Sequence, residues 1–105
     1  MEPEQQFKWA LLLIECMKQL KAEGLGFTDQ EVVPGLDGDP NGMFAWFICG
    51  HHAERERFDL QNAIEALKNK MRDAGFPRSA IDTLRGGVTS ETEIQAGGGR
   101  FYFFR

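Results

Sequence analysis

The chain is poor in the features that mark export, membrane insertion and disulfide stabilisation. It has two cysteines, four prolines and one tyrosine in 105 residues, and Glu2 and Glu4 stand where a signal peptide would carry Lys or Arg. The apolar run at residues 9–14 is far too short to cross a membrane. We therefore expect no export signal, no membrane span and no disulfide framework, which is typical of a reduced, cytoplasmic protein.

Basic charge is also scarce. The net charge is −4, and residues 1–52 carry three lysines against eight acidic residues. Residues 53–105 carry nine basic against eight acidic residues, without a basic cluster. Proteins that bind duplex DNA usually carry such a cluster, so the composition disfavours nucleic acid as a partner without excluding it.

Phenylalanine and glycine are plentiful instead. The chain has nine Phe, two Trp and twelve Gly, and its 42% hydrophobic and 27% charged residues are close to the globular average. Its length suits one domain that spans residues 1–105.

Two long helices and a short one are indicated by apolar spacing. Residues 5–23 and 60–74 each carry an apolar stripe with a period of 3.6 residues, followed by Gly24 and Gly75 as candidate C′ glycines. Asp59 is a candidate N-cap of the second helix. Pro77 predicts a short third helix that ends near Arg85.

The remaining segments favour strands. Residues 31–36 and 43–49 predict two strands, and residues 88–95 and 100–105, joined through the glycines of 96–99, predict a hairpin. The order α-β-β-α-(short α)-β-β looks like one α-β-β unit used twice. We expect an α+β fold, with an antiparallel sheet of about four strands and both main helices on one face.

Two short motifs contain possible metal ligands. Asp37 to Gly42 begins like a calcium loop, but its twelfth position is Ile48, so a hairpin loop is the simpler interpretation. Cys49, His51 and His52 have zinc-ligand side chains, yet a structural zinc site needs four ligands, and Asp37 or Asp39 would have to contribute. We expect no metal or cofactor, and keep a metal-dependent enzyme at Cys49, His51 and His52 as a second alternative function.

The aromatic strands are the most informative feature. Alternation puts Phe44 and Trp46 on one face of their strand and Phe47 on the other, and it separates Phe101 and Phe103 from Tyr102 and Phe104. Two helices can cover only one face. We expect them to cover Phe44, Trp46, Phe101 and Phe103, and to leave Phe47, Tyr102 and Phe104 on an open face beside Arg100.

An open aromatic face predicts a binding surface. Our main hypothesis is a non-catalytic protein-binding module, an inhibitor or regulator, that also forms a homodimer; the outward Leu11 of the first helix is additional apolar surface. The alternative is a single-stranded RNA- or DNA-binding protein that stacks bases on the same aromatics, with Arg100 and Arg105 on phosphates. The short helix or a loop folded over the face is the simplest remaining explanation.

Overall fold

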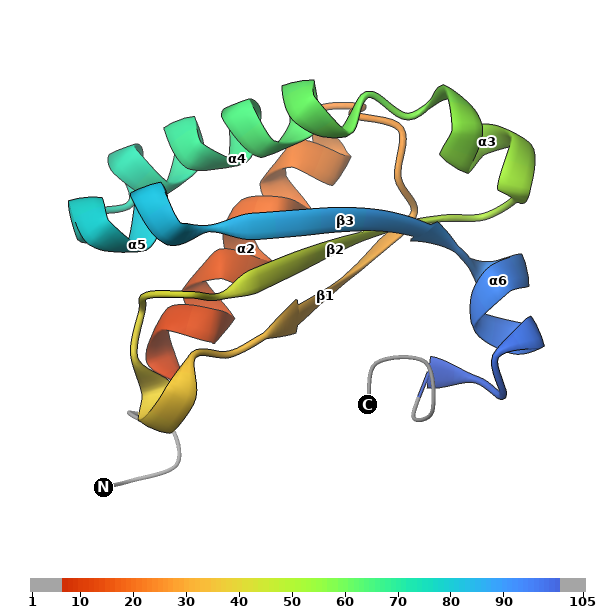
Figure 1. Cartoon of the computed structure of the whole chain (residues 1–105). Coiled ribbons are helices and arrows are strands. Elements are labelled where there is room, and N and C mark those ends of the chain that lie inside the picture. The colour runs from red at the N-terminus through yellow and green to blue at the C-terminus, as the bar shows by residue number, and fades with distance from the viewer. Residues whose placement is uncertain (1–6, 101–105) are drawn as a thin grey trace.

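A three-stranded sheet with two long helices packed on one face forms the framework of the protein (Figure 1). The computed structural model describes residues 7–100. The elements follow in the order α2 (Lys8–Ala22), β1 (Asp29–Val33), the 3-10 turn η1 (Leu36–Gly38), β2 (Phe44–Cys49), α3 (His52–Arg57), α4 (Leu60–Asp73), α5 (Arg78–Thr83), β3 (Arg85–Ser90) and α6 (Glu91–Ala96). The α+β class is confirmed. None of the helices in residues 7–100 is long and apolar enough to cross a membrane.

The two main helices form where the apolar stripes predict them. The buried face of α2 includes Leu13, Met17 and Leu20, and that of α4 includes Leu67 and Met71. These side chains meet in one core, on the same face of the sheet.

The ends of α4 follow from its flanking residues. The Asp59 carboxylate accepts a hydrogen bond from the backbone N–H of Asn62 at 3.0 Å, which satisfies one of the free donors of the first turn. Gly75 follows the last turn with φ of +86°, a left-handed conformation that glycine adopts without strain.

The sheet is mixed, with the order β1-β2-β3. β1 runs antiparallel to β2, with Val33 opposite Phe44, whereas β3 runs parallel to β2, with Arg85 opposite Phe44. Between β2 and β3 the chain passes through α3, α4 and α5. Such a long helical crossover is the connection that a parallel strand pair requires.

The predicted antiparallel sheet of four strands is therefore wrong, and so is the α-β-β repeat. Only one described strand follows α4, and it begins at Arg85, which we expected at the end of the short helix. The pattern also gives no sign of α3, because the alternating charges of residues 54–57 carry no apolar stripe. Residues 101–105, most of the last predicted strand, lie outside the described residues.

The strand predicted at residues 88–95 ends at Ser90, where α6 begins. Ser90 is the N-cap of α6: the Glu93 N–H donates to Ser90 Oγ at 3.2 Å, and the Ser90 hydroxyl donates to Glu93 Oε1 at 3.2 Å. The Ser-Glu-Thr-Glu sequence is the signal for a helix start. It outweighs the weak strand pattern of residues 91–95.

Removing the Ser90 hydroxyl should test this N-cap. We expect Ser90→Ala to lower the free energy of unfolding by about 1 kcal/mol, because the first turn of α6 loses its side-chain acceptor. Thr92→Ala, an exposed neighbour in the same turn, should change it by less than about 0.5 kcal/mol. Urea denaturation measures both, and equal stabilities of the two variants would contradict the capping role.

Candidate functional site

The face of the sheet that meets the helices contains Phe47. Its side chain is completely buried, with ring centroids 5.0 Å from Phe27 and 5.4 Å from Phe58. Ala45 and Cys49, which share its side of β2, belong to the same core. Our prediction that Phe47 lies on the open face is therefore wrong, and Phe47 is a core residue.

Phe44 and Trp46 lie on the opposite face of β2, away from α2 and α4, which reverses the predicted assignment. Their ring centroids are 5.0 Å apart, both side chains are partly buried, and Val33 lies opposite Phe44 in β1 with 42% of its surface exposed. We call Val33, Phe44 and Trp46 the aromatic strip.

A glycine in the neighbouring strand makes room for the aromatic strip. A Cβ atom at Gly87 would lie 3.0 Å from Trp46 Cζ3 and 3.3 Å from Phe44 Cζ. Both rings therefore lean over the bare backbone of β3. Rings that cover a strand glycine in this way shield its backbone and contribute to sheet stability.

Unlike charges border the aromatic strip on its two sides. Glu31 of β1 is the register partner of Trp46, and Arg85 of β3 is the register partner of Phe44. Within residues 7–100 neither Glu31 nor Arg85 forms an ion pair. The face thus presents an apolar centre between an acidic and a basic border.

α6 closes the other end of this face. It packs against β3, and Ile48, Thr89 and Ile94 are fully buried at this end. Arg100 Nη2 donates to Asp29 Oδ2 at 2.6 Å and to Glu91 Oε1 at 2.5 Å.

Arg100 is thus a structural clamp between β1 and α6 rather than a free cation. Burial lowers the pKa of its guanidinium, but the hydrogen bonds to Glu91 and Asp29 more than offset this effect and leave the pKa raised. Tyr102 and Phe104, the other predicted members of the open face, lie outside the described residues.

A hollow of about 690 Å³ lies at the end of the aromatic strip, between the start of β2 and the end of α5. Its lining combines one aromatic ring with polar and charged groups, namely Asn41, Gly42, Phe44, Asp82, Thr83, Leu84 and Arg85. The Gly42 N–H donates to Thr83 Oγ1 at 2.9 Å, which joins the β2 end of the hollow to α5. Phe44 therefore borders a concave surface, and Arg85 lies at its edge.

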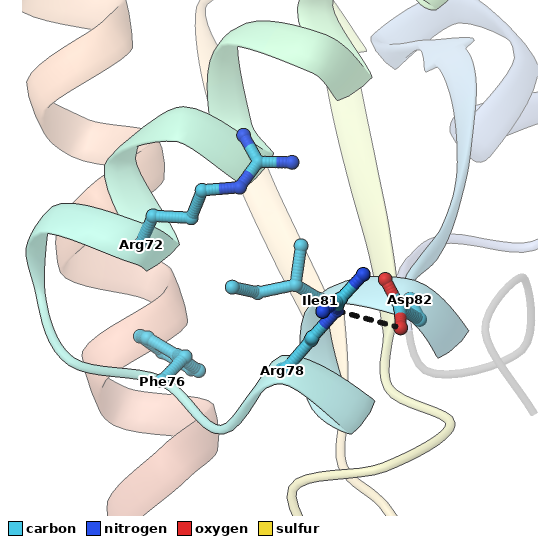
Figure 2. Close-up of a pocket in the computed structure, with 5 residues that line it drawn as sticks. All are labelled: Arg72, Phe76, Arg78, Ile81 and Asp82. Carbon is cyan, nitrogen blue, oxygen red and sulfur yellow. Dashed lines mark ion pairs between the residues drawn. The ribbon is translucent and has the colours of Figure 1, made fainter.

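A second hollow, of about 450 Å³, lies on the other side of α5 (Figure 2). Figure 2 shows the guanidinium groups of Arg72 and Arg78 on either side of Ile81, with Phe76 at the margin. Arg78 Nε is 3.8 Å from Asp82 Oδ2, and the Arg78 side chain is almost fully exposed. Because water screens these charges and Asp82 offsets one of them, the hollow is a weak site for an anion.

The metal-ligand candidates do not come together. Cys49 is buried, with its Sγ 3.8 Å from the Gly26 carbonyl oxygen, whereas His51 is exposed. His52 contacts Glu56 and Glu93 at 3.0 and 3.3 Å. Across the part of the chain that the structure describes, no group of three or more His, Cys, Asp or Glu side chains is arranged to hold a metal ion.

The Cys49 thiol is also unsuited to nucleophilic attack. Burial raises its pKa above the ordinary value for cysteine, and Glu54 raises it further, against a smaller opposing effect of Arg55. A thiol with a raised pKa is mostly protonated at neutral pH, and the thiolate is the reactive form.

Thiol titration tests the burial of both cysteines. Cys16 is buried as well, and burial raises the pKa of its thiol too. We expect neither thiol to react with a disulfide reagent such as DTNB within minutes at neutral pH, and both to react after denaturation. A thiol that reacts rapidly in the native protein and is lost in Cys49→Ala would contradict this placement.

A side chain at Gly87 should disturb the aromatic strip. We expect Gly87→Ala to displace the Trp46 ring and to shift the emission maximum of Trp46, measured in a Trp9→Phe background because the chain has two tryptophans. Gly50→Ala is the control, because a Cβ there meets nothing closer than 3.6 Å. An unchanged spectrum for Gly87→Ala would show that the rings do not lie over β3.

Leu11, the last predicted binding residue, lies on the outer side of α2 with 53% of its surface exposed. This agrees with its position outside the apolar stripe. Comparison with known proteins finds no matching family model, no matching curated protein and no matching solved structure.

Proposed function

We propose that the chain is a non-catalytic protein-binding module, an inhibitor or regulator, that holds a partner protein on the aromatic strip. The observation that carries the proposal is the position of Phe44, with Val33 beside it, on the sheet face opposite the two main helices. Sheets with one solvated face normally carry polar side chains there. Large aromatic side chains at such positions are typical of the cores of protein interfaces.

The charges around the strip define the chemistry of the partner. An apolar segment on Val33 and Phe44 would bring its flanks close to Glu31 on one side and Arg85 on the other. A segment with a basic flank and an acidic flank would pair with both. Such complementary charges fix the orientation of a bound partner and exclude partners of the wrong sign.

The state of Cys49 supports a binding role over the metal-dependent enzyme. Its thiol is buried with a raised pKa, and His51 and His52 lie outside the core on exposed positions. Among the described residues these side chains form no group that could hold a metal ion, and a thiol with a raised pKa is a poor ligand because cysteine binds metals as the thiolate.

Single-stranded nucleic acid is the second candidate, because bases can stack on Phe44 while Arg85 meets a phosphate. The acidic Glu31 on the same face opposes it, since it would repel the backbone. Binding of a labelled oligonucleotide that weakens steeply with salt would favour this candidate over a protein partner.

Substitution on the strip tests the proposal. A partner is captured with the wild-type chain, identified by mass spectrometry and purified, and its affinity is then measured by calorimetry. We expect Phe44→Ser to weaken binding about tenfold or more, because it removes a central aromatic anchor. We also expect Glu31→Lys to weaken it, because the basic flank of the partner would meet a like charge.

Leu36→Ser is the matched control. Leu36 is 86% exposed and lies in η1, outside the aromatic strip, so its loss should leave the affinity within about twofold of wild type. Circular dichroism verifies that each variant is folded. Wild-type affinity in folded Phe44→Ser would refute binding through the strip.

A further inference from the structure

Figure 1 shows α2 on one face of the sheet, so its outer side lies on the opposite side of the molecule from the aromatic strip. This outer side of α2 forms a second surface with apolar side chains. A shallow hollow of about 670 Å³ lies along it, lined by Lys8, Leu11, Leu12, Ile14, Glu15 and Lys18. Leu11 is 53% exposed, and Leu12 and Ile14 are partly exposed. Three apolar side chains are thus edged by charges of both signs.

Two of the three charged residues, Lys8 and Glu15, are placed symmetrically about the two leucines. Lys8 lies three residues before Leu11, and Glu15 lies three residues after Leu12. Residues three and four apart are neighbours on a helix surface, so Lys8 and Glu15 each lie beside both leucines. The midpoint between Leu11 and Leu12 is also the midpoint between Lys8 and Glu15.

We propose that this surface of α2 binds the same surface of a second copy of the chain, with the two helices antiparallel. A two-fold axis through the midpoint puts Leu11 opposite Leu12 of the second copy. It also puts Lys8 opposite Glu15 of the second copy, and the symmetry repeats each contact. The interface then has an apolar centre and two ion pairs at its rim.

A parallel pair of helices would lack this complementarity. Lys8 would face Lys8 of the second copy, and Glu15 would face Glu15. Like charges in contact disfavour an arrangement, whereas complementary charges favour it. The sequence of α2 therefore selects the antiparallel orientation.

The present contacts of the two charges leave them free to pair across the interface. Glu15 is 3.6 Å from Lys18 in an exposed pair, and Lys8 lies 5.1 Å from the Trp9 ring centroid. Exposed contacts of this kind contribute little to stability, so exchanging them costs little.

The size of the surface sets the strength of the association. α2 has 15 residues and is about 22 Å long, so a contact through one helix of each copy falls at the small end of specific interfaces. We expect a dimer that dissociates on dilution in the micromolar range, which sedimentation equilibrium of the whole chain can follow.

Substitution of Leu11, at the centre of the proposed interface, gives the first test. We expect Leu11→Ser to raise the dimer dissociation constant at least tenfold, whereas Leu36→Ser, at an exposed leucine in η1, should leave it within about twofold. A wild-type chain that stays monomeric at millimolar concentration would refute the proposal. Undiminished association of Leu11→Ser would refute it as well, since it would place the contact on another surface.

Charge reversal gives the second test, and it reports on orientation. Lys8→Glu and Glu15→Lys should each weaken association about tenfold, because each creates two like-charge contacts. The double variant should associate within about threefold of wild type, because it restores both pairs in the antiparallel arrangement only. Circular dichroism verifies that α2 stays helical when Glu15→Lys places a second positive charge beside Lys18.

The results separate this proposal from the protein-binding function of the aromatic strip. Rescue by the double variant supports the antiparallel pair, and a double variant weaker than either single variant would refute it. Partner affinity measured in Leu11→Ser should remain that of wild type, because the strip lies on the other side of the sheet. Loss of partner binding in Phe44→Ser, conversely, leaves the dimer intact.

Discussion

The burial of Phe47 is the constraint on which the rest of the structure depends. Its ring is enclosed by Phe27 and Phe58 and by the side chains of α2 and α4, so this side of β2 must face the helices. Because alternate residues of a strand point to opposite faces, Phe44 and Trp46 are then held on the other face. A shift of β2 by one residue would bury Phe44 or Trp46 and expose Phe47, which makes the register costly to change.

The glycine pair of β3 adapts the sheet to both of its faces. A Cβ at Gly86 would collide with Ile64 of α4 and lie 3.1 Å from the Ala45 carbonyl oxygen, so the missing side chain lets α4 approach the sheet closely. Gly87, on the other face, makes room for the rings of Phe44 and Trp46. The two glycines, which directly follow the predicted end of the short helix at Arg85, thus lie in β3 and let side chains pack closely on both faces of the sheet.

Helices and strands with a strong apolar period could be predicted from the sequence. Which face of the sheet meets the helices could not. α2, β2 and α4 follow from their apolar spacing, and the N-cap of α4 follows from Asp59. Both faces of β2 are apolar, however, so its own pattern does not say which side meets the helices. β1 carries the missing signal, because Asp29 and Glu31 mark its outer side and are paired in register with Ile48 and Trp46. That register depends on a contact between strands, which a single sequence does not contain.

The two candidate surfaces differ in how far the sequence predicts them. Leu11 stands outside the apolar stripe of its own helix, so a local pattern is enough to find it, whereas the aromatic strip needs the sheet. The two surfaces lie on opposite sides of the core, and this arrangement has a functional consequence. An antiparallel pair of α2 helices would direct the two aromatic strips away from each other, so one dimer could hold two partners. Because the two strips face away from each other, a compact dimeric partner would link two different dimers rather than span both strips of one, since avidity within one complex requires that both sites be engaged simultaneously.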